Sequence, residues 1–489
     1  MNTLIQFDQN AYDAAFVVIP IVLVAVAALV LIVKKIKARK TNGGSAHVSP
    51  PYATNGMLDG IKTFSGADKP LPIGLLDLAR KAGNNFQIHL PTTRMTFFSA
   101  DINVVKEVLN DRDALKSDRY HAFRLMHDGG DDIFTSDGMY WKHSRKGMAP
   151  AFSSNHIRRM NEVVVEKTEE FIQSRLNDFV KSGESFDLCD EMMSLTLVII
   201  CKAAFEYEMS SNEQEYFVHE LELALTEVQK ASIPFRWRLG SFIPTVQRAR
   251  QAGKNVLALA TNILETYKKL ENPTKGTAID CIVNNPNYKS DRERASDLVI
   301  LLFAGHDTTS FSLAFTLLEL SLHQDEQDKL RNALRQMPSM DERIKCLELQ
   351  CVIKEGLRIN PTAALASGRY LAKDLIVKGG DDKDMLIPKG SAFGYSPMLV
   401  CRNEQYFKDA HLFKPRRWID PSKEAVAALQ PFSIGRRSCV GQNLAQAEMQ
   451  NVLARLCSDF RFHCKDEGIN TYAGTWKPYK SRLTVEKVY

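Results

Sequence analysis

The sequence predicts a mainly α-helical protein with small β-sheets, preceded by one N-terminal transmembrane helix. Several long segments carry apolar residues at the helix period, whereas strand-like runs are few and short. An uncharged and almost wholly apolar run of 20 residues stands near the N-terminus, long enough for a helix to cross a bilayer. The 489 residues carry a net charge of +5 without a basic block, which argues against a nucleic-acid partner.

The apolar run at residues 14–33 predicts where the chain meets a membrane. Five basic residues follow it within 34–40, while Asp8 and Asp13 precede it, so the positive-inside rule places the body of the protein in the cytosol. A cleaved signal peptide is the alternative, because Ala25-Val26-Ala27 resembles a cleavage site, but the expected basic residues before the run are missing. We therefore expect a single-pass protein of the endoplasmic reticulum. Its predicted parts are a short non-cytosolic N-terminus (1–13), a transmembrane anchor (14–33), a basic and Gly/Pro-rich linker (34–51) and one large domain (52–489).

The large domain is predicted to be mostly helical because its longest periodic segments have helical spacing. No internal repeat or second linker divides it. The expected helices are residues 161–179, 212–230, 246–270, 291–323 and 442–459, and the expected strands are 94–99, 374–378 and 385–388.

The run from residue 431 to 441 is the most informative part of the chain. Cys439 stands between Gly435 and Gly441, where backbone can approach a bound group closely, and Phe432 can cover the sulfur. Arg437 lies two residues before the cysteine, within reach of a bound carboxylate. A small buried apolar side chain is the ordinary role of a free cysteine and is the alternative. For a lone cysteine that ordinary role would be the favoured one.

A polar cluster interrupts the otherwise apolar helix predicted at 291–323. Ala304 and Gly305 are small and leave room for a diatomic ligand and water, and Gly305 weakens a helix by roughly 1 kcal/mol relative to alanine. Asp307 and Thr308 need hydrogen-bond partners if they are buried, and they could relay protons. A helix N-cap or a solvent-facing patch is the alternative, which fits poorly between flanking Leu and Phe residues.

Charged pairs elsewhere in the chain are weak signals when taken singly. Glu355 and Arg358 are three residues apart and share a helix face, as many surface ion pairs do. Trp141 and Arg145 are four apart and also share a face. Arg369 alone would be a surface arginine.

Taken in order, these motifs resemble the cytochrome P-450 family over nearly the whole chain. The resemblance implies the P-450 fold, haem b as cofactor and Cys439 as the iron ligand. It implies a structural triad of Glu355, Arg358 and Arg417. Arg416 stands where a glutamate is commoner in the family, but the triad is unaffected because its arginine is Arg417. The residues implied for catalysis are Asp307 and Thr308, and those implied for haem binding are Trp141, Arg145, Arg369, Phe432, Gly435, Arg437, Cys439 and Gly441.

The resemblance implies a haem-thiolate monooxygenase that inserts one oxygen atom from O₂ into a small lipophilic substrate of the fatty-acid, sterol or terpenoid class. Electrons would come from NADPH through a separate flavoprotein reductase, which Arg402, Arg416 and Arg436 could steer. We expect pocket residues at Phe303, Ala304, Thr308 and 363–367, and no haem ester, because Ala304 stands where some omega-hydroxylases carry a glutamate. The segment 233–244 is either a membrane-dipping substrate entrance or an ordinary loop.

Two other functions remain open from the sequence. A haem-thiolate isomerase or dehydratase would rearrange hydroperoxides without O₂ or a reductase, although it would not need the proton relay suggested by Asp307 and Thr308. A membrane-anchored haem carrier or gas sensor would need no substrate at all.

Overall fold

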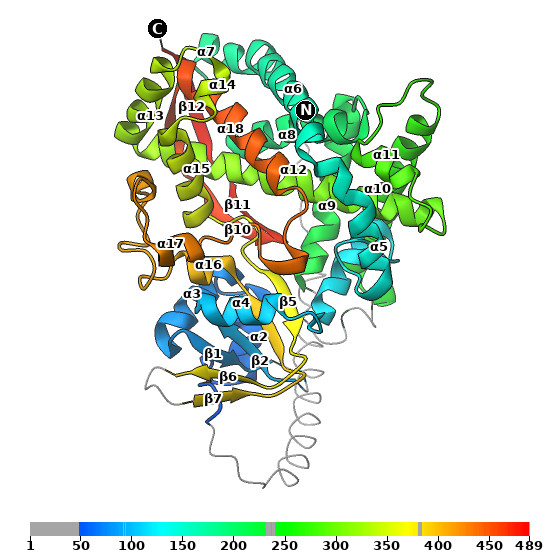
Figure 1. Ribbon diagram of the computed structural model, residues 1–489, viewed down its shortest axis with the longest axis vertical. Coiled ribbons are helices and arrows are strands. Elements are labelled where there is room, and N and C mark those ends of the chain that lie inside the picture. The colour runs from blue at the N-terminus through cyan, green and yellow to red at the C-terminus, as the bar shows by residue number, and fades with distance from the viewer. Residues whose placement is uncertain are drawn as a thin grey trace.

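Figure 1 shows helices throughout the molecule, with one group of strands at its lower end and another near the C-terminus at its top. The computed structural model describes residues 48–90, 92, 94–230, 236, 240–379 and 384–488. The predicted non-cytosolic N-terminus (1–13), the anchor (14–33) and most of the linker lie outside the described residues. The predominance of helices with small sheets is as the sequence predicts.

The α-helices vary in length from one turn to nine. Their bounds are α2 (Met57–Ser65), α3 (Leu71–Ala82), α4 (Ile102–Asn110), α5 (Gly138–Met148), α6 (Ser154–Phe171), α7 (Asn177–Ser182), α8 (Leu188–Phe205), α9 (Ser211–Gln229), α10 (Pro244–Lys268), α11 (Ala278–Val283), α12 (Asp291–Leu322), α13 (Gln324–Gln336), α14 (Met340–Arg343), α15 (Leu347–Ile359), α16 (Pro397–Cys401), α17 (Lys423–Ala428) and α18 (Gln442–Asp459).

The strands form four small sheets. The largest has the order β1 (Asn85–Ile88), β2 (Thr96–Ser99), β8 (Ala392–Tyr395), β5 (Ala366–Tyr370) and β3 (Leu115–Lys116), and the β2–β8 pairing in it is parallel. The others are β4 (Phe186–Asp187) with β12 (Arg482–Lys487) and β9 (Phe460–Asp466), the pair β10 (Ile469–Ala473) and β11 (Thr475–Tyr479), and the pair β6 (Leu375–Lys378) and β7 (Asp384–Ile387).

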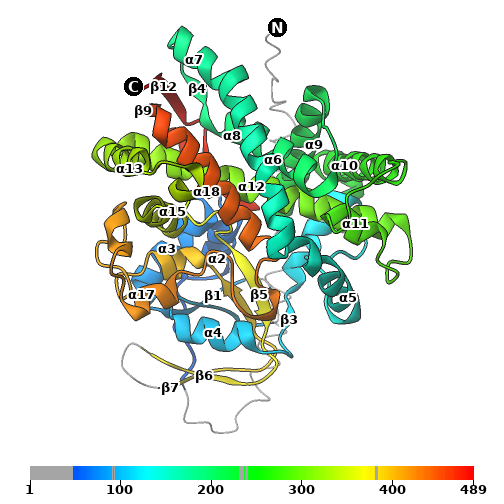
Figure 2. The same cartoon turned by 45° about the horizontal axis from the view of Figure 1, so that its top comes forward.

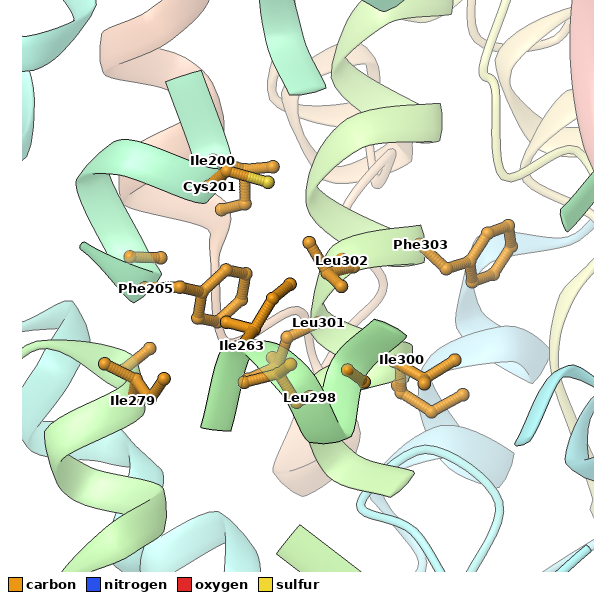
Figure 3. Close-up of a cluster of buried hydrophobic side chains, with 14 of the residues drawn as sticks. Ile200, Cys201, Phe205, Ile263, Ile279, Leu298, Ile300, Leu301, Leu302 and Phe303 are labelled. Atoms are coloured by element: carbon orange, nitrogen blue, oxygen red, sulfur yellow. The ribbon is translucent and has the colours of Figure 1, made fainter. Parts of the chain in front are cut away.

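The helix α12 runs through the middle of the protein and is buried for most of its length. Ser290 caps its N-terminus by accepting a hydrogen bond from the Glu293 amide at 3.3 Å. Leu302 and Leu298 pack with side chains of α8, α10 and α11, whereas Phe303 points away from Phe205, toward the other side of the helix (Figure 3). Among the described residues, α12 is the one helix long and apolar enough to cross a membrane, but its burial identifies it as a core helix.

The helix α18 lies against α12 in both views (Figures 1 and 2). It begins three residues after Cys439, so the packing of these two helices fixes the cysteine loop relative to the polar cluster of α12. The predicted boundaries of 442–459 agree with α18. The helix predicted at 161–179 instead begins at Ser154 and is interrupted by the π-helical turn η3 (Ile172–Leu176) before α7.

Candidate haem-thiolate site

The loop before α18 holds Cys439 in a fixed backbone frame. The Cys439 amide donates to the carbonyl of Phe432 at 2.9 Å, across the short turn η7 (Gly435–Arg437). Gly435 has a φ of +75°, and a Cβ there would lie 2.6 Å from the carbonyl oxygen of Leu109. A glycine is therefore required at 435 because the loop packs against α4, and the close approach to a bound group stays a prediction. At Gly441 a Cβ would meet Phe152 at an ordinary 3.7 Å, so contacts within the protein do not require glycine there.

The Cys439 side chain is accessible although it lies inside the fold. Burial raises the pKa of its thiol, while the Gly441 amide and the charge of Arg145 act in the opposite direction. A group can be both accessible and desolvated only when it faces an internal space that protein surrounds. Six of the other eight cysteines are buried. Cys439 is thus the cysteine that fits a bound group beside its sulfur.

A second accessible surface interrupts the buried helix α12. Ala304 is exposed and Thr308, four residues on and therefore on the same face, is partly accessible, although Phe303, Asp307 and Thr309 are buried. The Thr308 hydroxyl donates to the Ala304 carbonyl at 2.6 Å. Gly305 has another role than the sequence suggested: a Cβ there would approach Ile200 of α8 to 2.9 Å, so its small size serves helix packing.

His306 lies in the same cluster but faces the interior. It is 1% exposed, and neither ring nitrogen has a hydrogen-bond partner within the described part of the chain. Burial lowers its pKa to about 3, so the imidazole is neutral at physiological pH. Its ring stands at a steep angle to Phe217, with centroids 6.1 Å apart.

Asp307 is buried and connected to a strand far away in the sequence. The hydroxyl of Thr475, on β11, donates to the Asp307 carboxylate. Burial raises the pKa of Asp307 to about 6, whereas the Thr475 hydrogen bond and the charge of Lys477 lower it. Lys477 in turn pairs at 2.5 Å with Glu222, which is half exposed. Asp307 is thus linked by a hydrogen bond to Thr475 and by charge alone to the Lys477–Glu222 pair at the surface. These groups on β11 and α9 escaped the sequence analysis because no motif contains them.

A cluster of cations surrounds the start of α5. The guanidinium of Arg437 lies 3.6 Å from the centroid of the Trp141 ring, pairs with Asp137 and donates to the Ser136 carbonyl at 2.9 Å. On β3, Lys116 is paired in register with Arg369 of β5, which is 2% exposed. Sequence analysis did not identify Lys116, because a two-residue strand outside any motif gives no signal.

The charges of this cluster are not balanced by the protein. The pKa of Lys116 is held well below its usual range by burial and then by the charges of Arg369 and Arg437. Among the described residues, Asp137 is the carboxylate bonded directly to this group, since Asp132 is already engaged by the buried His127. Buried cations in excess require an anion. A flat dianionic cofactor such as haem fits the accessible sulfur, the accessible face of α12 and this cluster.

Below the loop, the predicted triad forms a buried network. Glu355 and Arg358 of α15 are fully buried and joined at 2.9 and 2.8 Å, and Arg417 reaches Glu355 at 3.0 Å. The indole of Trp418 and the amide of Lys414 also donate to Glu355, at 2.9 and 2.8 Å. The network joins α15 to the 3-10 turn η6 (Pro415–Trp418), which supports the loops around the cysteine.

The three arginines expected to steer a reductase differ in their exposure. Arg402 was expected to steer a partner, but it donates to Ile359 and Asn360 at 2.7 and 2.9 Å and is largely buried, so it serves the fold. Arg436 and Arg416 are exposed. Arg416 lines two hollows, one of about 470 Å³ between α13 and η6 and one of about 310 Å³ between α13, α15 and η6. None of Cys439, Asp307 and Thr308 lines either of them. Most of the segment 233–237 lies outside the described residues, and Phe242, just after it, is 84% exposed.

Comparison with known proteins agrees with this geometry. The family model described as cytochrome P450 matches residues 50–482. Cytochrome P450 4e2 of Drosophila melanogaster is 27% identical over 67% of this chain and 66% of its own length. Cytochrome P450 monooxygenase 124 of Postia placenta is 26% identical over 82% of this chain and 81% of its own. Cytokinin hydroxylase of Arabidopsis thaliana is 28% identical over 68% and 66%.

A solved structure shows the same fold. The crystal structure of a cytochrome P450 superposes with a TM-score of 0.71 and covers 86% of this chain and 98% of its own, at 20% sequence identity. At this identity the likeness concerns the fold alone.

Proposed function

Since the chain belongs to the cytochrome P450 family, we propose that it is a haem-thiolate monooxygenase that inserts one oxygen atom from O₂ into a lipophilic substrate. Haem b is the proposed cofactor, and a separate flavoprotein reductase that uses NADPH is the proposed electron donor. We further propose that the chain is anchored in the endoplasmic reticulum membrane with its catalytic domain in the cytosol. A fatty acid, sterol or terpenoid is the proposed class of substrate.

The observation that carries the proposal is the accessible sulfur of Cys439 within a desolvated interior. In this role Cys439 would ligate the iron, and the cations Arg369, Arg437 and Lys116 would bind the haem propionates, as would Arg145 and Trp141. Gly435 would keep the loop close to α4, and Phe432 would hold the cysteine amide. Haem would supply the activation of O₂, with electron density donated by the thiolate.

The residues of α12 would control protons. Asp307 is neutral below a pH of about 6 and ionised above it, so near neutrality it can both accept and release a proton. Glu222 meets solvent at the surface, and Thr308, next to Asp307 in α12, is partly accessible. Thr308 would hold water or oxygen there by a hydrogen bond, while the apolar surroundings exclude bulk water.

The first test is the spectrum of the ferrous protein with carbon monoxide. We expect the red-shifted Soret band typical of thiolate ligation, and its loss in Cys439→Ala. Cys464→Ala, at a partly accessible cysteine of β9, is the matched control and should keep the band. A spectrum typical of histidine ligation, or a band that survives Cys439→Ala, would contradict the proposal.

The second test separates the monooxygenase from its alternatives. Membranes that contain the protein, a reductase and NADPH should consume O₂ in the presence of a substrate and yield a product with one added oxygen. Turnover of a hydroperoxide without NADPH would instead indicate an isomerase or dehydratase. A carrier or sensor would show no substrate-dependent O₂ uptake, and Thr308→Ala would leave its function intact.

A further inference from the structure

Lys477 is a cation that lies between the interior and the surface of the fold. Its side chain, on β11, is 12% exposed, and its ammonium pairs at 2.5 Å with Glu222 of α9, which is 51% exposed. Among the described residues, Glu222 is the one carboxylate that forms an ion pair with Lys477. Water screens a half-exposed carboxylate, so this pair compensates the enclosed ammonium only in part. A negative group on the inner side would complete the compensation.

The ammonium of Lys477 lies against the face of α12 that carries Asp307. Its Nζ is 5.6 Å from the ring centroid of Phe311, which is fully buried and follows Asp307 by four residues, one turn further along the same helix face. Thr475, two residues before Lys477 and therefore on the same face of β11, donates its hydroxyl to the Asp307 carboxylate. One face of β11 thus brings a hydroxyl donor and a cation to one buried acid.

The charges of Lys477 and Glu222 act on Asp307 with opposite sign. Burial raises the pKa of Asp307 to about 6, while the Thr475 hydrogen bond and Lys477 lower it and Glu222 raises it. Burial acts to lower the pKa of Lys477, but Glu222 and then Asp307 outweigh it and raise that pKa. Lys477 therefore stays protonated near neutrality and acts on Asp307 through its charge rather than by giving up a proton.

Other titratable groups near Lys477 come from α8 and α12. Burial lowers the pKa of His306 to about 3 and raises that of the Cys189 thiol, so both are neutral near pH 7. Burial and the neighbouring carboxylates raise the pKa of Asp190 to about 6, and the phenol ring of Tyr479 lies 5.7 Å from the ammonium. Asp190 ionises in the same interval as Asp307, so any experiment on this cluster must control for it.

We propose that Lys477 is a positioning residue for proton delivery: shared between Asp307 inside the fold and Glu222 at the surface, its ammonium stabilises the ionised form of the Asp307 carboxylate. Each time Asp307 gives a proton toward Thr308, it becomes a buried anion until it takes a proton back from water. An opposite charge lowers the cost of that anion. This inference rests on the proposed function, because it assigns a control of the acid at the same site.

A structural ion pair that only fastens β11 to α9 is the alternative. Removing either partner would then have the same effect on the protein, a loss of stability that does not depend on the charge of Asp307. The proposed role requires opposite effects, because Lys477 favours the ionised Asp307 and Glu222 opposes it.

The experiment unfolds the full-length, haem-bound protein with urea from about pH 4 to pH 9. In each background the free energy of unfolding is measured with Asp307 and with Asp307→Asn, and the difference should change with pH until Asp307 is fully ionised. In Lys477→Met it should become constant about one pH unit higher than in wild type, because the favourable charge is lost. In Glu222→Gln it should become constant at a lower pH than in wild type, and Lys477→Arg, which keeps the charge, should behave like wild type.

Two controls separate this effect from general changes of charge. Lys202 pairs with Glu208 at 2.5 Å elsewhere on the surface, so Lys202→Met removes a comparable ion pair, and Asp190→Asn removes the other acid of the cluster. Neither should move the pH at which the Asp307 difference becomes constant. Shifts in the same direction for Lys477→Met and Glu222→Gln, no shift in either, or a shift in a control would overturn the proposal. If Lys477→Met does not fold, Glu222→Gln decides, since it changes a half-exposed side chain.

A second measurement tests whether this electrostatic contact serves turnover. Membranes with the protein, a reductase and NADPH are assayed without substrate for the share of NADPH that ends as hydrogen peroxide rather than water. Two electrons and two protons convert O₂ to the peroxide, and two more of each are needed for water, so this share should rise with pH as Asp307 loses its proton. The rise should move to higher pH in Lys477→Met and to lower pH in Glu222→Gln. Unmoved profiles would also contradict the proposal.

A failure of this inference can be told apart from a failure of the proposed function. If wild type lacks the thiolate carbon monoxide band, the haem-thiolate proposal fails whatever the unfolding data show. If the band is present and the opposite shifts are absent, the inference alone fails.

Discussion

Replacing Glu355 by glutamine tests how much the network under the cysteine loop contributes to stability. Glu355 accepts five hydrogen bonds, from two nitrogens of Arg358, from Arg417, from the Trp418 indole and from the Lys414 amide, at 2.8 to 3.0 Å. Glutamine has the same shape but no charge, and its amide group presents donors to donors. It would leave Arg358 fully buried without a counter-charge.

The expected loss follows from this burial. Removing one partner of a buried ion pair costs about 3–5 kcal/mol, because the other charge remains desolvated. Arg358 keeps three backbone carbonyl partners, those of Cys401, Ala410 and Leu412, which place the loss toward the lower end of that range. A decrease of about 3 kcal/mol in the free energy of unfolding is therefore expected for Glu355→Gln.

Urea unfolding followed by circular dichroism measures this change. Glu326→Gln is the matched control, since Glu326 pairs at 2.6 Å with Lys329, whose side chain is half exposed. A surface pair of this kind contributes less than about 1 kcal/mol. If both variants lose the same small amount, the reasoning from buried charge is refuted.

Three further predictions concern the interior charges. Folding raises the pKa of Asp307 from 3.8 to about 6 and so favours the protonated acid, which means that this stability is present below 3.8 and lost as the pH rises through about 6. In urea unfolding, the stability of Asp307→Asn relative to wild type should therefore increase as the pH rises across that interval. A gain confined to acid pH would contradict this. The variant should also form less product for each NADPH consumed. Burial raises the pKa of Asp297 to about 7, so Asp297→Asn should be relatively more stable at pH 8 than at pH 6, and equal differences at both would contradict the shift. Lys116→Met should stabilise the haem-free protein and speed haem transfer to apomyoglobin about tenfold, whereas unchanged transfer would exclude a propionate contact.

The predictable part of the fold is the part with local periodicity. The helices expected at 212–230, 246–270, 291–323 and 442–459 agree with α9, α10, α12 and α18 to within two residues at each end. The first turns of α6 were missed because residues 154–160 offer only two apolar positions. The strands β9 and β12 were also missed. Buried and more exposed residues alternate along part of each, which is the pattern typical of a strand.

The predictable part of the candidate site is the part contained in motifs. Cys439, Asp307, Thr308 and the triad of Glu355 each lie in a short run whose spacing is informative. Their partners do not, because contacts such as Asp307 with Thr475 join positions 168 apart in the chain. Lys116 became visible only when burial was known, since a lysine outside any motif is ordinarily solvated. The roles assigned to all these residues in haem binding and catalysis remain predictions.

The hydrogen bond from Thr475 to Asp307 has a consequence for how the protein is made. Thr475 follows Asp307 by 168 residues in the chain, so α12 leaves the ribosome long before its buried carboxylate can find that partner. A premature stop just before Thr475 would preserve every motif, from Trp141 to Gly441, in the translated product. It would nevertheless leave Asp307 without its hydroxyl donor and remove Lys477 and Trp476 from the interior. Intact motifs in a truncated transcript are therefore no evidence of a working enzyme.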